Sequence, residues 1–129
     1  MFLVKVITPQ AKVRLINTEI LNIVNHEGQM GLLSHHMPII TMIRISKMST
    51  VEEDGRHEYA VSGGVLFYKD NEATLLADAF ESEEEIDLER ALSAKERAEQ
   101  RLSSGDPDID IKRAKIALTK AINRISVKE

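Results

Sequence analysis

Apolar and polar residues alternate along most of residues 3–77, and turn-forming residues interrupt this alternation at short intervals. A period of two predicts β-strands that bury one face. The predicted strands are residues 3–7, 13–16, 19–25, 39–45, 48–52, 57–61, 65–68 and 73–77, with a short one at 32–33. Asp54-Gly55 and Asp70-Asn71 each lie between two such runs and predict hairpins. This spacing of short strands indicates a compact antiparallel β-sandwich or barrel.

Glycine marks two further breaks in the same region. Gly28-Gln29-Met30-Gly31 predicts a tight turn before Leu32-Leu33, and Ser62-Gly63-Gly64 predicts a second turn or a bulge.

The pattern changes at Ser82, after which apolar residues recur every three or four positions. Ser82 and Glu85 have the spacing of a capping box and predict that a helix begins there. Ser103-Ser104-Gly105 is predicted to end it, and Asp106-Pro107 to open a second helix. The apolar positions are Leu88, Ala91, Ala94, Ala98 and Leu102 in the first helix and Ala114, Leu118, Ala121 and Ile125 in the second. The short connection predicts an antiparallel two-helix hairpin.

We therefore expect a β-sandwich domain over residues 1–81 and an α-helical hairpin over residues 82–129. The apolar stripes of the helices are narrow and rich in alanine, and a hairpin of this length buries little surface by itself. We expect it to pack on the sandwich or on a partner, and to be able to change between the two.

Composition excludes several classes of function. The chain has no Cys, which excludes disulfides, thiolate nucleophiles and Cys-ligated metals. It has two Tyr, three Phe and no Trp, so a base-stacking surface for nucleic acid is not expected. No apolar run approaches the ~20 residues that span a bilayer, and the N-terminal run, broken at Lys5 and Pro9, is too short for a signal peptide. We expect a soluble or peripheral protein.

Charge is unevenly distributed along the chain. Residues 86–129 carry ten of the 17 Lys/Arg and eight of the 21 Asp/Glu, which leaves seven and 13 in residues 1–85. The β region is therefore acidic, at −6, and the helical region is mildly basic, at +2. Such a helical region suits an acidic protein surface or a phosphate, but not duplex DNA.

Helical spacing brings charged side chains of the two helices together. Asp87 and Arg90 are three residues apart, and an antiparallel hairpin sets them opposite Lys120 and Arg124, which are four apart. Arg97 follows two turns after Arg90. Several cations on one patch predict a polyphosphate site, because arginine offers a planar fork to phosphate oxygens. The alternative is surface ion pairing, such as Asp87 with Arg124, at no more than about 1 kcal/mol for each pair.

No catalytic or metal site is predicted. His35 and His36 are adjacent, so in an extended segment they point to opposite faces, and no third ligand is spaced to join them. The glycine segments do not lead from a strand into a helix as phosphate loops do, and Ser62 lacks the setting of a catalytic nucleophile. Four methionines crowd one region and suit either a contact surface or core filling: Met30, Met37, Met42 and Met48.

Five segments carry a family resemblance. They are Val6-Ile7-Thr8-Pro9, Gly28-x-x-Gly31 with His36-x-Pro38, Ala60-Val61-Ser62-Gly63-Gly64, Ile86-Asp87-Leu88-Glu89-Arg90-Ala91, and Arg113-Ala114 through Ala121-Ile122-Asn123-Arg124. In order and spacing they resemble the epsilon subunits of bacterial F-type ATP synthases, over essentially the whole chain. The resemblance implies an N-terminal antiparallel β-sandwich followed by a C-terminal antiparallel two-helix hairpin.

The resemblance implies a non-catalytic rotor subunit of the central stalk, peripheral to the cytoplasmic face of the bacterial cell membrane. The sandwich would bind the gamma subunit and the ring of c subunits. The hairpin would fold on the sandwich or extend along gamma to the catalytic alpha and beta subunits, where it inhibits ATP hydrolysis. No cofactor is required, and no nucleic acid is a partner.

The resemblance also implies two sets of site residues. Several members bind ATP in the folded hairpin as a regulatory ligand, and the matching positions are Glu81, Asp87, Arg90, Ala91, Arg97, Lys120 and Arg124. ATP-binding members have arginine where this chain has Lys120, which keeps the charge but loses the fork. Contact with gamma and the c ring is expected at Gln29, Met30, His36, Met37 and Pro38. The chain departs from the family there, with Gln29 in place of an acidic residue and Ser34-His35-His36 before Pro38.

Two other functions compete with this one. An autonomous nucleotide sensor, built from the same sandwich and hairpin, would not co-purify with a gamma subunit. A hydrolase would depend on Ser62 or on the histidines, and Ser62→Ala or His36→Ala would then change an activity.

Overall fold

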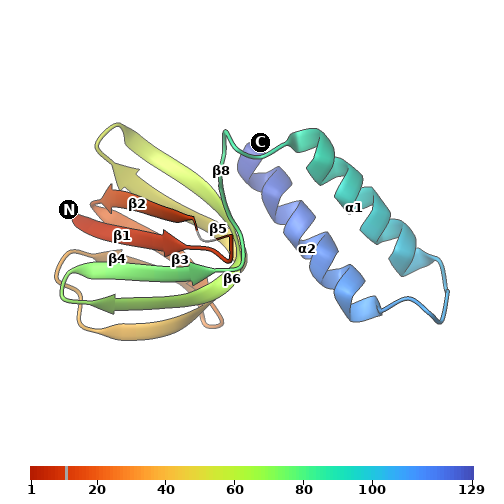
Figure 1. Ribbon diagram of the computed structural model, residues 1–129, viewed down its shortest axis with the longest axis horizontal. Helices are drawn as coiled ribbons and strands as arrows, with labels where there is room; N and C mark the ends of the chain where they lie inside the picture. Colours follow the sequence, from red (N-terminus) through yellow and green to blue (C-terminus); the bar gives the residue numbers. More distant parts are fainter. Residues whose placement is uncertain (11) are drawn as a thin grey trace.

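Eight strands precede two helices in the computed structural model, which describes residues 1–10 and 12–129 (Figure 1). The strands are β1 (Phe2–Ile7), β2 (Val13–Thr18), β3 (Ile20–Asn25), β4 (Gly28–Leu33), β5 (Ile39–Glu52), β6 (Gly55–Lys69), β7 (Glu72–Ala77) and β8 (Phe80–Ser82). The helices are α1 (Leu88–Ser103) and α2 (Ile111–Lys128). The predicted β-sandwich followed by a helical hairpin is confirmed.

The strands form one sheet in the order β2-β1-β7-β6-β5-β3-β4, with β8 paired to β6. β5 and β6 run through both layers of the sandwich, because each half of β5 pairs with the opposite half of β6. β2, β1 and β7 extend one layer, and β3 and β4 extend the other. The predicted antiparallel pairing is confirmed with one exception, because β1 and β7 are parallel.

At two places where the sequence predicted an interruption between strands, the structure has a continuous strand. Residues 39–45 and 48–52 belong to the single strand β5, and Ser62-Gly63-Gly64 lies within β6. The glycines allow a close approach rather than a turn, because a Cβ on Gly64 would lie 2.1 Å from Leu76 O. The tight turn predicted at Gly28-Gln29-Met30-Gly31 is also wrong, because these four residues belong to strand β4 (Gly28–Leu33). The turn lies just before them and is closed by the Glu27 N–H, which donates to Asn25 Oδ1 at 2.9 Å.

The alternating pattern correctly predicted the buried face of the sandwich. Every second residue of β1 is buried, beginning with Phe2. Val4 and Leu75 from one layer join Leu21 and Leu32 from the other in a single core. The two layers are therefore held together by apolar burial on their inner faces.

The helices pack against each other through small residues, as their stripes predicted. Ala91 and Ala98 of α1, with Ala114 and Ala121 of α2, are almost completely buried. The helices can therefore approach closely along their length. α2 lies against β5 and β6, whereas α1 lies on the outside of the hairpin (Figure 1).

α1 begins later than predicted. Its N-cap is Asp87, which accepts a hydrogen bond from the Arg90 N–H at 3.2 Å, so the predicted start at Ser82 is wrong. Ile86 explains the difference, because it is buried beside the sandwich and the residues just before it form a turn. The Ser82 N–H still donates to Glu85 Oε1, at 3.1 Å, but this bond closes a turn and no helix.

α2 also begins later than predicted. Asp110 is the N-cap and accepts from the Arg113 N–H at 3.1 Å. Asp106 was expected in that position, but its side chain accepts from the Asp108 N–H at 2.9 Å and stabilises the loop between the helices. The predicted end of α1 is confirmed at Ser103.

Candidate functional site

The residues predicted to bind ATP lie on the helical hairpin and on the strand that leads into it. Arg124 of α2 forms an ion pair with Glu81 of β8, with Arg124 Nε 2.9 Å from Glu81 Oε1. Its Nη2 donates to Glu81 Oε2 at 3.1 Å. Both side chains are about a quarter exposed, at 26%, so this pair is better shielded from water than most surface pairs.

The predicted pairing of Arg124 with Asp87 is therefore not formed. Asp87 instead caps α1, and Ala91 is buried one turn later against α2. Asp87 and Ala91 thus position the start of α1, whereas Arg90, which lies between them in the sequence, is exposed.

Arg90 and Arg97 lie together on the surface of α1. They are seven residues apart, which is two helical turns, and they line one shallow hollow of about 300 Å³ with Glu89 and Ser93. Among the described residues, neither arginine has an ion-pair partner within 4.0 Å. Their guanidinium groups are therefore available to an anion.

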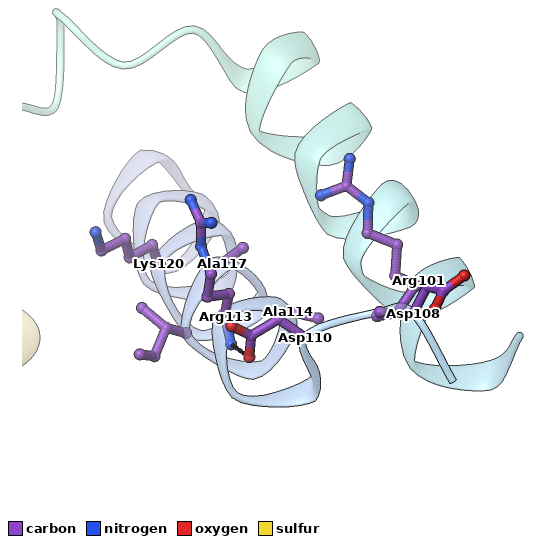
Figure 2. Close-up of a pocket in the computed structure, with 9 residues that line it drawn as sticks. Arg101, Asp108, Asp110, Arg113, Ala114, Ala117 and Lys120 are labelled. Carbon is purple, nitrogen blue, oxygen red and sulfur yellow. Dashed lines mark hydrogen bonds between the residues drawn. The ribbon is translucent and has the colours of Figure 1, made fainter. Parts of the chain in front are cut away.

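Lys120 lines a different and larger hollow, shown in Figure 2, where the two helices meet near their connecting loop. This hollow of about 720 Å³ receives Arg101 from α1 and Arg113 from α2, and the side chains of these two arginines point the same way. Asp108 and Asp110 line it on the loop side. No ion pair joins Arg101, Arg113 or Lys120 to another residue in the described part of the chain.

The cations that line these two hollows lie on one face of the helical hairpin. Three cations follow one another at steps of seven and four residues on each helix, and a shared hollow puts the two rows on the same side. We call this the cationic face: Arg90, Arg97 and Arg101 on α1, and Arg113, Lys120 and Arg124 on α2. Sequence reasoning missed Arg101 and Arg113, although their spacing from Arg97 and Lys120 was a readable signal.

The residues predicted to meet partner subunits do not form one patch. Gln29 and Met30 lie on β4 and line a hollow of about 460 Å³ that also receives Arg56. His36, Met37 and Pro38 lie in the loop beyond the other end of that strand. Met37 is 72% exposed, and the His36 ring packs edge-on against Tyr68, with centroids 5.7 Å apart.

The loop that carries His36 is tied to the turn between β6 and β7. The His35 N–H donates to Asn71 Oδ1 at 2.8 Å, and Tyr68 OH donates to Leu33 O at 2.9 Å. His35 and Asn71 both have a positive φ, of 63° and 60°. Two loops far apart in the sequence are thus joined by hydrogen bonds at one end of the sandwich.

One layer of the sandwich exposes apolar side chains that sequence reasoning did not single out. Ile40 pairs with Phe67 across β5 and β6, and Leu76 continues this face on β7. β1 and β2 extend it through the same register. We call it the outer apolar face: Val13, Leu15, Ile40, Met42, Phe67 and Leu76, all of them exposed. Contiguous exposed apolar surfaces are typical of protein interaction sites, among other contact sites.

None of the described helices is long and apolar enough to cross a membrane.

Comparison with known proteins identifies the family. Residues 1–83 match the family model of the ATP synthase delta/epsilon chain β-sandwich domain, and residues 84–129 match that of its long α-helix domain. The ATP synthase epsilon chain of Bacillus licheniformis is 40% identical over 96% of this chain and 95% of that protein. The epsilon chain of Caldicellulosiruptor bescii is 40% identical over 99% of this chain and 93% of that protein.

A solved structure supports the fold alone. One chain of the Euglena gracilis mitochondrial ATP synthase OSCP/F1/c-ring structure has a TM-score of 0.78 and 22% identity, covering 98% of this chain and 80% of that one. The β-sandwich and the helical hairpin thus occur together in that solved chain. With matches across both domains, this protein belongs to the ATP synthase delta/epsilon chain family, as an epsilon-type, non-catalytic subunit of an F-type ATP synthase.

Proposed function

We propose that this subunit is part of the rotor in the central stalk, where it helps couple proton flow to ATP synthesis. We further propose that its helical hairpin inhibits ATP hydrolysis when extended, and that ATP bound to the folded hairpin relieves this inhibition. The first proposal is supported by the family membership and by the outer apolar face. The second is supported by the cationic face, which is the single observation that carries it.

The outer apolar face is proposed to bind the gamma subunit. It spans β2, β1, β7, β6 and β5, and its side chains are exposed in the isolated chain. Burying such a surface contributes about 25 cal/mol for each Å² removed from water, which favours a permanent contact. The loop of His36, Met37 and Pro38 is proposed to meet the c ring, and Gln29 and Met30 are proposed to add a contact from β4. The protein would then lie at the cytoplasmic face of the bacterial membrane, held there by the complex.

The contact with gamma is testable by co-purification. Phe67→Ser is expected to reduce recovery of this chain with a co-expressed gamma subunit, because it removes an aromatic ring from the centre of the outer apolar face. Leu92→Ser is the matched control, since Leu92 is an exposed apolar residue on α1, away from the outer apolar face. Equal recovery of both variants would contradict this assignment.

The hairpin is held on the sandwich by few interactions, which suits an element with two positions. Asn123 Nδ2 donates to Ser46 O at 2.8 Å, and Lys128 Nζ donates to Glu83 O at 3.1 Å. Arg124 adds its ion pair with Glu81 of β8. Val127 adds a small apolar contact with the linker to the sandwich. Extended, the basic hairpin would reach the alpha and beta subunits.

ATP is proposed to bind the cationic face of the folded hairpin. Arg90 and Arg97 offer unpaired guanidinium groups, and Lys120 adds a charge from the facing helix. Bridging both helices would favour the folded hairpin, because a ligand shifts an equilibrium toward the state that it binds better. The full proposed set is Glu81, Asp87, Arg90, Ala91, Arg97, Lys120 and Arg124, extended by Arg101 and Arg113.

Isothermal titration calorimetry of the full chain with ATP, with and without Mg²⁺, tests this site. One-to-one binding is expected, and Arg90→Ala should weaken it by about 1.5–3 kcal/mol, the usual value of a charge-assisted hydrogen bond. Lys115→Ala is the matched control, because Lys115 is an exposed cation on α2 that does not belong to the cationic face. Unchanged affinity in Arg90→Ala would show that the site is elsewhere, and no binding at all would remove ATP from the mechanism.

A further inference from the structure

Three side chains of the types that bind metal ions meet at the tip of the β5–β6 hairpin, and none of them belongs to the cationic face or the outer apolar face. Glu52 ends β5, Asp54 lies in the turn, and His57 follows on β6. One donor atom from each lies within 4.8 Å of the other two. His57 Nε2 is 2.6 Å from Asp54 Oδ1.

Neighbouring side chains hold two of these donors in place. Tyr59 OH donates to Glu52 Oε2 at 2.6 Å, and the buried Thr50 donates to the same oxygen at 2.5 Å. The other oxygen of Glu52 carries no such bond among the described residues and is free to act as a ligand. The His57 ring lies along that of Tyr59, with centroids 6.4 Å apart. Outer-shell hydrogen bonds of this kind orient metal ligands in proteins.

The charge around the tip favours a cation. Glu52 and Asp54 contribute two carboxylates, and Glu84 acts on His57 electrostatically from the turn before α1. Within the described chain, no Lys or Arg lies within 4.0 Å of these three carboxylates. Among the described residues, the His57 imidazole is therefore the only nearby group that could balance the negative charge of these carboxylates.

We propose that Glu52, Asp54 and His57 form a binding site for a divalent transition-metal ion of the Zn²⁺ class. One imidazole nitrogen and two carboxylate oxygens suit Zn²⁺, whereas Ca²⁺ and Mg²⁺ prefer oxygen ligands alone. Ligands bound to one ion must lie closer together than 4.8 Å. Asp54 can supply that movement, because its side chain is 74% exposed and sits in a turn. Water would complete the coordination.

The site borders the connection between the two domains. Glu84 belongs to the segment that joins β8 to α1, and its negative charge adds to that of Glu52 and Asp54 near His57. The metal site does not depend on the ATP proposal, because none of its residues lies on the helical hairpin.

Titration of the full chain with Zn²⁺ against a chromophoric chelator tests the proposal. One ion per chain is expected, and His57→Gln and Asp54→Asn should each weaken binding by about tenfold or more. Asp54→Asn creates an Asn-Gly turn, which favours the same hairpin, so this variant keeps the fold. His26→Gln is the matched control, since His26 is exposed in another β-turn.

A second measurement separates this site from the other histidines. In NMR spectra of the full chain, Zn²⁺ should shift the ring signals of His57 first, and an excess of Mg²⁺ should not reverse the shift. Three results would overturn the proposal: no Zn²⁺ bound by the parent protein, equal affinity in His57→Gln, or loss of binding only in His35→Gln or His36→Gln.

Discussion

Asn123→Ala is predicted to loosen the helical hairpin from the sandwich. In the folded position, Asn123 Nδ2 donates to Ser46 O at 2.8 Å, in a partly buried environment. This is a direct hydrogen bond from α2 to a strand of the sandwich, and alanine cannot replace it. The substitution leaves the apolar contact of Val127 in place, so its effect reports on the Asn123 side-chain donor, which also donates to Val61 O at a longer 3.5 Å.

The magnitude follows from what happens to the Ser46 carbonyl. While the hairpin stays folded, α2 covers this oxygen and water cannot fully replace the lost donor. A buried group left without its partner costs about 1–3 kcal/mol. Once the hairpin moves away, the oxygen is hydrated and the cost disappears. The ratio of folded to released hairpin should therefore fall by roughly 5- to 150-fold.

Fluorescence energy transfer can measure this ratio. The chain has no Cys, so dye-labelled cysteines can be introduced at two exposed positions, Glu27 in the sandwich and Lys112 at the start of α2. The fraction of molecules with the short distance should fall in Asn123→Ala. In the assembled ATP synthase, the same variant should inhibit ATP hydrolysis more strongly, because inhibition is assigned to the released hairpin.

Thr119→Ala is the control, since Thr119 is exposed on the same helix. Among the described residues, its hydroxyl bonds only within that helix, to Lys115 O at 2.9 Å. It should leave the energy transfer unchanged. If Asn123→Ala gives the same distance distribution as the parent, with circular dichroism showing intact helices, then this bond does not hold the hairpin and the argument fails.

Three further predictions concern other parts of the molecule. Lys120→Arg should raise the affinity for ATP up to about tenfold, because it adds a planar fork; calorimetry showing no gain would place Lys120 away from the phosphates. Gly64→Ala should lower the free energy of unfolding by about 1–3 kcal/mol or more, since its Cβ would lie 2.1 Å from Leu76 O; urea denaturation measures this loss. Burial alone would raise the pKa of Glu85, but hydrogen bonds from Arg14 and Ser82 hold it below its usual 4.5. Since a lowered carboxyl pKa stabilises the fold above the unfolded-state value, thermal stability should fall with pH below about 4.5, and Glu85→Gln should flatten this dependence.

The sequence allowed the architecture to be predicted because its two periodicities are strong. Alternation in β1 and the alanine stripes of the helices both mark faces that are buried in the structure. Element boundaries were less accurate. The predicted helix start at Ser82 failed because Ile86 is buried by tertiary packing that no local pattern reveals. The glycines of β6 failed for a similar reason, since their role depends on the approach of Leu76.

The candidate sites were predicted in part. The spacing of Arg90 and Arg97 correctly indicated a shared surface, whereas the position of Glu81 beside Arg124 depends on how α2 docks. The outer apolar face was not predicted, because it arises from strand register rather than from sequence neighbours. Glu52, Asp54 and His57 were overlooked, although their close spacing around a hairpin turn was visible.

The parallel pairing of β1 with β7 also bears on how the protein is made. β1 is synthesised well before β7, its partner on one side, which lies some 70 residues later at Glu72–Ala77. During synthesis the first hairpin therefore presents an unpaired strand edge until β7 arrives, a state prone to association with other chains. The helices pack mainly on each other, through contacts close in sequence, and such contacts form fast. Completion of the sandwich, rather than of the regulatory hairpin, is the slow step that this topology imposes.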